Sequence, residues 1–205
     1  PEVKEQLESS GIPVFVDYSS YEKKPLGRTE WLKLYGLLSG KEEEATAAFD
    51  REKEAFEQIS QDKATGKTVA FFYITSNGEV NVRKASDYLP KMIEMAGGSY
   101  ILKQDEEDDS VSSTMSMDME SFYAAAKDAD YIIYNSTVDG EISTVDELTE
   151  KSGLLEHFKA VEEGNVYCTS KNLYQSTMKL GSIISDLYKI LHGEEDTLTY
   201  IYRLE

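Results

Sequence analysis

The sequence predicts an α/β fold with a mainly parallel sheet flanked by helices. Apolar runs rich in β-branched and aromatic residues, such as TVAFFYIT at 68–75 and YIIY at 131–134, alternate with amphipathic helical stretches. The intervals between the predicted strands leave room for helical crossovers, which connect parallel strands. At 205 residues the chain is long enough for one or two domains with a sizeable core.

The N-terminal residues predict a helix followed by a short strand. Pro1 suits a first helical turn, Glu2 and Glu5 suit its positive end, and Gly11 suits its stop. The apolar run IPVFVDYS at 12–19 then predicts a strand. The chain begins without methionine, on a helix and strand with no unit before them, so we expect it to be a fragment of a larger protein.

Two helices are predicted between residue 25 and about residue 61. In the first, Trp31, Leu34, Tyr35 and Leu38 recur at helical spacing, and Gly40 ends the helix. The second is about five turns long and begins with the acids at 42–44. It is amphipathic, with an apolar side made of Ala45, Ala48, Phe49, Phe56 and Ile59.

After a polar break at 61–67, strands and helices alternate. The strand at 68–75 leads to a turn at Asn77-Gly78, and a helix with Asp87 or Ser86 as its cap ends at Gly97-Gly98. SYILK at 99–103 predicts a short strand, and residues 104–117 predict an acidic, serine-rich loop.

The C-terminal part continues this alternation. Asp118 caps a helix that leads into the strand at 131–134, and a turn follows at Asp139-Gly140. Residues 143–164 predict a helical stretch capped by Ser143 or Thr144, and NVYCTS at 165–170 predicts a strand. An apolar-faced helix then runs to Gly193.

The composition excludes several classes of function. Lys and Arg number 21 against 39 Asp and Glu, and the resulting charge of −18 would repel nucleic acid and anionic lipid surfaces. Cys168 is the only cysteine and there are two histidines, so neither an internal disulfide nor a Cys/His zinc site is expected. No apolar run approaches the roughly 18–20 residues of a membrane span.

The usual motifs of catalysis and metal binding are also missing. MAGGS at 95–99 follows a helix and indicates a helix stop rather than a phosphate loop, and no GxSxG is present. The acidic run Asp105–Asp109 lacks the spacing of a calcium loop, and the alternating Met115, Met117 and Met119 have no His or Cys nearby to complete a copper site. We therefore predict no catalytic residues and no metal ligands.

Tyrosine and arginine suggest where a ligand binds. Ligands of open α/β sheets lie at the carboxyl ends of the strands, which here are the positions after Ile74, Tyr134 and Thr169. Many of the 14 tyrosines fall near predicted strand ends, and Arg28 and Arg83 lie in comparable connections. Tyrosine combines an apolar face with a polar tip, and arginine binds carboxylates in bidentate fashion, so such a cleft suits a rigid, partly aromatic, anionic ligand.

Four segments together resemble ABC-transporter substrate-binding proteins of the iron-complex type, which handle siderophores, haem and cobalamin. They are 7–45 (LESSGIPVFVDYSSYEKKPLGRTEWLKLYGLLSGKEEEA), 82–98 (VRKASDYLPKMIEMAGG), 117–134 (MDMESFYAAAKDADYIIY) and 163–187 (EGNVYCTSKNLYQSTMKLGSIISDL). The resemblance implies the C-terminal lobe of a two-lobed periplasmic binding protein with a helical backbone. Residues 1–24 would end the N-terminal lobe, 25–62 would form the connecting helices with the backbone helix, and 63–205 would form the C-terminal α/β lobe.

Glu120 has two interpretations. It lies in the first turn of a predicted helix, where a carboxylate stabilises the helix dipole and needs no further role. The family, however, carries a Glu at this place in each lobe, followed by an Asp and an apolar strand, and those glutamates form salt bridges with arginines of the permease. The resemblance therefore implies that Glu120 docks the protein on its permease.

The resemblance also implies a ligand site, which we expect to contain Arg28 at the lobe junction and Arg83 after the first strand of the lobe. Tyr21, Tyr73, Asn135 and Tyr174 are further candidate ligand contacts. We expect a ferric siderophore ahead of haem and cobalamin. The iron would arrive inside the ligand, so no cofactor or protein-bound metal is expected.

The leading hypothesis is a non-enzymatic, extracytoplasmic solute-binding component of an ABC importer, attached to the membrane only through a lipid anchor that would precede residue 1. It would bind an iron–siderophore or a related chelate between its lobes and deliver it to the permease subunits. One alternative is a chelatase-like or cofactor-using enzyme on the same two-lobed fold, because fold does not fix function. A third, a surface adhesion module, depends only on the acidic, tyrosine-rich surface.

Overall fold

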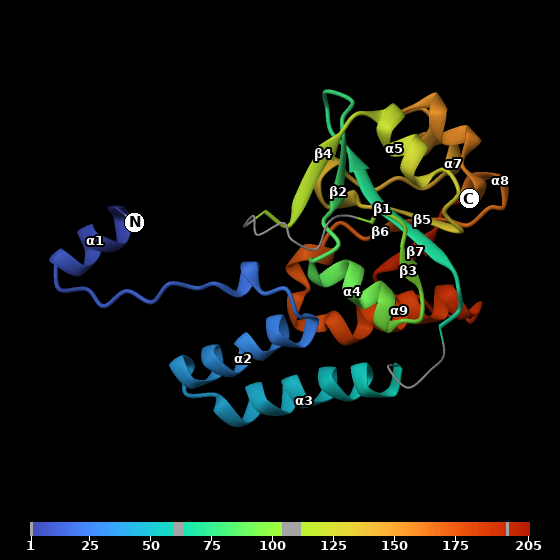
Figure 1. Cartoon of the computed structure of the whole chain (residues 1–205). Coiled ribbons are helices and arrows are strands. Elements are labelled where there is room, and N and C mark those ends of the chain that lie inside the picture. The colour runs from blue at the N-terminus through green and yellow to red at the C-terminus, as the bar shows by residue number, and fades with distance from the viewer. Residues whose placement is uncertain (1, 60–63, 104–111, 196) are drawn as a thin grey trace.

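The computed structural model describes residues 2–59, 64–103, 112–195 and 197–205. The acidic run Asp105–Asp109 and residues 61–63 of the polar break at 61–67 lie outside these ranges. Within them, one seven-stranded sheet is flanked by helices on both faces (Figure 1).

The sheet is parallel at its centre and antiparallel at both edges. Its strands are β1 (Thr68–Ile74), β2 (Val80–Arg83), β3 (Ser99–Tyr100), β4 (Thr114–Met117), β5 (Tyr131–Tyr134), β6 (Val166–Thr169) and β7 (Ile201–Arg203). They follow the order β4-β2-β1-β5-β6-β7, and β3 pairs with β1. The β1–β3, β1–β5 and β5–β6 pairings are parallel, whereas β1–β2, β2–β4 and β6–β7 are antiparallel. The predicted α/β class is confirmed, with a parallel centre carrying antiparallel edge strands.

Two layers of helices cover the sheet. On one side α4 (Tyr88–Met95) packs against α9 (Leu180–His192), and on the other lie α5 (Met119–Ala126) and α8 (Lys159–Glu162) (Figure 1). Phe72 of β1 meets Phe122 of α5 with ring centroids 4.5 Å apart, and Phe122 stacks on Phe158 at 5.6 Å. All three rings are fully buried, and each burial contributes about 1.5–3 kcal/mol of hydrophobic stabilisation.

The two helices predicted in this N-terminal part are confirmed as α2 (Pro25–Ser39) and α3 (Glu42–Ile59). They pack closely because Gly36 has no side chain: a Cβ there would lie 2.4 Å from the Cβ of Ala45. Helix α3 also packs along α9, where Glu52 accepts a hydrogen bond from the Gly181 amide at 2.7 Å. Glu52 thereby satisfies one of the free N–H groups at the start of α9 and ties α3 to α9.

The N-terminal segment differs from the prediction in one respect. Helix α1 (Glu2–Ser9) forms as expected, but it has no buried residue and extends away from the rest of the molecule (Figure 1). The strand predicted at 12–19 is wrong, because residues 12–18 have no regular structure and Ser19–Tyr21 form a 3₁₀ turn. An apolar, β-branched run becomes a strand only when another strand pairs with it, and none of the described strands does.

Three further predictions need correction. Residues 143–164 form not one helical stretch but α7 (Val145–Thr149), a 3₁₀ helix at Gly153–His157, and α8. Thr144 is the cap, and with Glu147 it completes a reciprocal capping box.

Residues 114–117 of the predicted loop form strand β4, and β7 was not predicted at all. The predicted turn at Asp139-Gly140 ends the short helix α6 (Ser136–Asp139).

Candidate ligand-binding site

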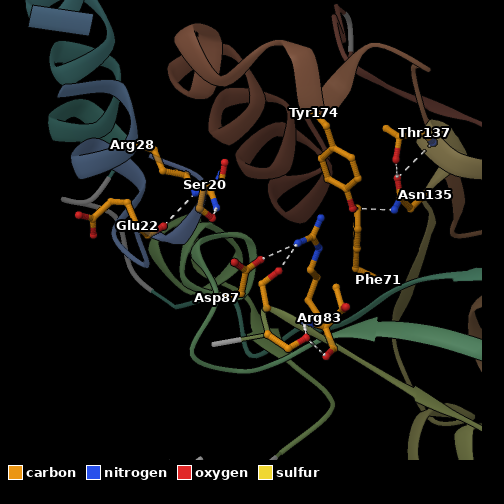
Figure 2. A network of polar contacts seen from close by, with 12 residues as sticks. Ser20, Glu22, Arg28, Phe71, Arg83, Asp87, Asn135, Thr137 and Tyr174 are labelled. Atoms are coloured by element: carbon orange, nitrogen blue, oxygen red, sulfur yellow. Dashed lines mark hydrogen bonds and ion pairs between the residues drawn. The ribbon is translucent and has the colours of Figure 1, made fainter. Parts of the chain in front are cut away.

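The candidate site lies at the carboxyl ends of β5 and β6, beside the last residue of the antiparallel strand β2, on the α4 side of the sheet. Asn135 follows β5, and its backbone amide donates to the Phe72 carbonyl of β1 at 2.8 Å. The Asn135 Nδ2 atom donates to the Tyr174 hydroxyl at 2.7 Å, while its Oδ1 accepts from the Thr137 hydroxyl at 2.7 Å (Figure 2). Because Asn135 is only 1% exposed, these bonds fix both its amide and the phenol of Tyr174.

Arg83 ends strand β2 beneath the same tyrosine. Its guanidinium carbon lies 4.6 Å from the centre of the Tyr174 ring. Its Nη1 atom lies 3.2 Å from the Ser113 hydroxyl and 3.3 Å from Asp87 Oδ2 (Figure 2). The Tyr100 hydroxyl donates to the Arg83 carbonyl at 3.0 Å. Three groups therefore hold Arg83: Tyr100 at its carbonyl, Tyr174 on the face of its guanidinium and Ser113 at Nη1.

Asp87 and Arg83 form a buried pair in which the arginine is charged and burial opposes ionisation of the aspartate. Both residues are less than 10% exposed. Burial raises the pKa of Asp87 by more than the nearby Arg83 charge lowers it. Although Nη1 lies 3.3 Å away, Asp87 Oδ2 accepts no hydrogen bond from the described residues. Burial alone would lower the pKa of Arg83, but Tyr174, Asp87 and Tyr88 raise it overall, so the arginine stays charged.

Arg28 contacts this cluster through the ring of Tyr88. Its guanidinium lies 4.1 Å from the centre of the Tyr88 ring, and Arg83 lies 5.9 Å from the same ring. Arg28 Nε donates to the Glu22 carbonyl at 2.9 Å, and Nη2 donates to the Ser20 carbonyl (Figure 2). Burial raises the pKa of Tyr88 to about 12, so its ring stays neutral beside the two cations.

The structure therefore brings three of the predicted ligand residues together, namely Arg83, Asn135 and Tyr174. Tyr73 of β1 pairs with Asn81 and so lies on the same face of the sheet as Arg83, two residues along β2. Tyr21 is 57% exposed and packs on Tyr18, with ring centres 6.1 Å apart. Among the described residues, no hydrogen bond or ring contact joins Tyr21 or Tyr73 to the cluster.

Two members of the cluster were not predicted as site residues. Asp87 was expected only as a helix cap, and Tyr88 was not singled out. Their neighbours come from distant parts of the chain. Arg83 ends a strand and Asp87 follows a turn, so the two residues share no helix or strand whose periodicity would place them side by side. The buried Arg–Asp pair was therefore not visible in the sequence.

A polar pocket lies next to the cluster, on the side of Thr137. This pocket of about 410 Å³ opens beside Thr137, and its other lining residues are Glu141, Lys171, Asn172 and Gln175. Over the described ranges, no three His, Cys, Asp or Glu side chains gather in a way that could hold a metal ion. None of the helices in those ranges is long and apolar enough to cross a lipid bilayer.

Glu120 lies apart from the cluster, exposed in the first turn of α5. The predicted cap of that helix is confirmed, since Asp118 Oδ1 accepts from the Ser121 amide at 2.7 Å. Helix α5 packs on Phe72, whereas Arg83 projects from the opposite face of the sheet.

Solved structures share this fold. The periplasmic heme binding protein HutB of Vibrio cholerae is 18% identical, with a TM-score of 0.69 over 92% of this chain and 73% of that one. The siderophore periplasmic binding protein from the fuscachelin gene cluster of Thermobifida fusca is 20% identical, with a TM-score of 0.67 over 94% and 68% of the two chains.

Sequence comparison extends the relationship. An uncharacterized lipoprotein of Methanocaldococcus jannaschii is 32% identical over 188 residues, which are 90% of this chain and 43% of that protein. A second lipoprotein of the same organism is 25% identical over 99% of this chain and 53% of its own length. The chain spans about half the length of the curated relatives it matches. A family model described as periplasmic binding protein matches residues 2–173, and the chain therefore belongs to the periplasmic binding protein family.

Proposed function

We propose that this chain is part of the extracytoplasmic solute-binding component of an ABC importer for an anionic iron complex. The family and the solved structures with this fold are solute-binding proteins rather than enzymes, which disfavours a chelatase-like activity. The names of the similar structures include heme and siderophore binding proteins.

The observation that carries this proposal is the buried, charged Arg83, whose guanidinium lies beside Tyr174 near the carboxyl ends of β5 and β6. Its only anionic neighbour in the described cluster is Asp87, whose ionisation burial opposes. A carboxylate or catecholate oxygen entering the cluster would supply the missing negative charge and would form charge-assisted hydrogen bonds. Tyr174 provides an aromatic wall that Asn135 holds in place.

A ferric siderophore fits these surroundings better than haem does. The porphyrin ring of haem needs a broad apolar lining, since small-molecule sites match the polarity of their ligands. Around the cluster, the pocket beside Thr137 is lined by hydroxyl, amide and charged side chains. Iron would arrive already chelated, so that the protein would bind ligand oxygens and not the metal itself.

Two features of the whole protein belong to the same proposal. The relatives named as lipoproteins favour a lipid anchor on the complete protein, outside the cytoplasm. Glu120, exposed on α5, would pair with an arginine of the permease. An exposed ion pair contributes little affinity, so its role would be to set the orientation of the docked complex.

The test is a ligand screen of the full-length protein. Trp31 is the only tryptophan in this chain and lies one turn after Arg28 in α2. We would follow its fluorescence and the thermal midpoint while adding ferric tris-catecholate, ferric tris-hydroxamate, haemin and cobalamin. A ligand at 100 times its Kd stabilises the folded state by about 2.7 kcal/mol.

We expect one of the ferric siderophores to give saturable stabilisation and to be recovered chemically unchanged. Stabilisation by haemin alone would identify haem, and not a siderophore, as the ligand. Turnover of a ligand, or no response to any of the four, would contradict the proposal.

A further inference from the structure

A continuous chain of contacts joins the ligand site to the segment that precedes helix α2. It begins at Tyr174, whose ring covers Arg83 at 4.6 Å. Arg83 then lies 5.9 Å from the ring of Tyr88, and Arg28 lies 4.1 Å from that ring. Arg28 in turn holds the carbonyls of Ser20 and Glu22. Figure 2 shows Arg28 directed toward this segment and Arg83 directed toward Tyr174.

The segment at the far end of this chain, residues 19–24, is fixed by several independent contacts. Lys91 of α4 donates to the Lys23 carbonyl at 3.0 Å. The Glu22 side chain lies directly over Gly27, where an added Cβ would come within 2.8 Å of Glu22 Cδ. The segment is thus held by α2 and α4, the two helices that Tyr88 and Arg28 bring together.

Tyr88 contacts both Arg83, on the ligand side of this chain of contacts, and Arg28, on the side of residues 19–24. It is 4% exposed, and its neutral ring is approached by two guanidinium groups. Cation–π attraction is stronger when the partners are desolvated, and it depends on the position of the cation over the ring. A movement of Arg83 toward a ligand would therefore change the packing of Tyr88, and through it the packing of Arg28.

We propose that Tyr88 and Arg28 are positioning residues that couple occupancy of the Arg83 site to the orientation of residues 19–24. This inference rests on the proposed function, because a ligand on Arg83 gives the coupling its purpose. Arg28 then acts on the segment rather than on the ligand, since its Nε and Nη2 atoms are directed to the segment carbonyls. Residues 19–24 connect α2 to the part of the chain that carries α1 (Figure 1).

Coupling of this kind is reciprocal. If a ligand at Arg83 stabilises the ordered state of residues 19–24 by some factor, then loosening those residues must lower the affinity for the ligand by the same factor. The amides of Tyr21, Glu22 and Lys24 report on the segment, because they donate within it to the Tyr18 carbonyl, the Ser19 carbonyl and the Glu22 carboxylate.

The experiment measures hydrogen exchange of these amides in the full-length protein. Tyr88→Leu removes the ring, and Tyr88→Phe keeps it as the matched control. We expect exchange at 21–24 to rise at least fivefold in Tyr88→Leu and to stay within twofold of wild type in Tyr88→Phe. The amides of Phe122–Ala126 in α5, on the other side of the sheet, should stay unchanged in both if the lobe remains folded.

The second arm adds ferric tris-catecholate and ferric tris-hydroxamate. In the wild type, the one that binds should slow exchange at 21–24; in Tyr88→Leu it should bind several-fold more weakly and leave exchange at 21–24 unaffected. Ligand binding with unchanged exchange in the wild type, or wild-type affinity in Tyr88→Leu, would overturn the coupling.

A third arm separates this inference from the proposed function. If the wild type binds neither complex, the siderophore assignment of the proposed function fails, and the ligand-free effect of Arg83→Met decides the coupling alone. A rise of at least threefold in exchange at 21–24, with α5 unchanged, supports it. A change of less than twofold refutes it.

Discussion

At the scale of single residues, the site is defined by a buried arginine whose counter-charge is incomplete. Arg83 and Asp87 both lie out of water, and the carboxylate is the partner that burial discourages from ionising. Removing one partner of a buried ion pair leaves an uncompensated charge, whereas removing both leaves none. This difference allows the stability of the pair to be separated from its role in binding.

We expect Arg83→Gln to lower the free energy of unfolding by about 3 kcal/mol, because Asp87 then lacks its cation. The loss should be larger at pH 7 than near pH 4. A carboxyl whose folded pKa is raised destabilises the fold as pH rises through that pKa, and its cost disappears below its unfolded pKa of about 3.9. Urea unfolding at the two pH values measures both effects.

The double variant Arg83→Gln/Asp87→Asn is the matched control. It should recover most of the lost stability and still bind the ferric complex at least tenfold more weakly than wild type, a loss of about 1.4 kcal/mol. Wild-type affinity in the double variant would show that Arg83 stabilises the lobe without touching the ligand.

At the scale of elements, local patterns predicted helices and buried strands well. Asp118, Thr144 and Gly193 mark helix ends through groups close in sequence, and β1 and β5 are apolar along most of their length. Strand β4 was predicted as a loop because TMSM has no apolar run. It becomes a strand by pairing with β2, which lies about 35 residues earlier. The strand predicted at 12–19 failed for the converse reason, since its pattern is strong and no described strand pairs with it.

The same distinction applies to the site. Arg83, Asn135 and Tyr174 were predicted because strand ends and connections can be placed from local patterns. The contact of Tyr88 with Arg28 depends instead on how α2 packs on α4. Packing between helices 60 residues apart is not encoded in any short motif, so the role of Tyr88 emerged only from the structure.

Asp130 allows a test of how the central elements are tied together. Its Oδ2 accepts from the Thr68 amide at 2.8 Å and the Thr68 hydroxyl at 3.0 Å, and its Oδ1 accepts from Lys159 at 2.6 Å. These bonds join the starts of β1, β5 and α8. Burial acts to raise the pKa of Asp130, but Lys159 and Thr68 outweigh it and lower the pKa overall.

A lowered folded pKa stabilises the protein above the unfolded pKa, and this contribution is lost as pH falls through the folded pKa. We therefore expect Asp130→Asn to cost about 1–2 kcal/mol at pH 7, and we expect this deficit to close as pH falls below the unfolded pKa of about 3.9. Denaturant unfolding as a function of pH measures it. Asp128→Asn, two residues away and exposed, is the control and should have little effect. An Asp130→Asn deficit that is constant with pH would contradict this electrostatic account.

At the scale of the whole molecule, ligand binding and docking are assigned to opposite faces of the sheet. Arg83 and Tyr73 point toward the side covered by α4, whereas α5, which carries Glu120, packs on Phe72 from the other side. A change at Glu120 therefore has no direct path to the ligand cluster. Binding and delivery can be altered one at a time.

We expect Glu120→Arg in the full-length protein to leave ligand affinity within twofold of wild type and to reduce uptake by about tenfold, since reversing a charge at an interface replaces attraction with repulsion. Uptake of the iron-labelled complex by cells, compared with Kd in solution, measures the two effects separately. Glu94→Arg makes the same charge change on the exposed side of α4 and should leave both unchanged. Normal uptake with Glu120→Arg would reduce Glu120 to a first-turn acid that stabilises its own helix. Reduced uptake in both variants would instead indicate that delivery depends on overall charge rather than on a docking contact at α5.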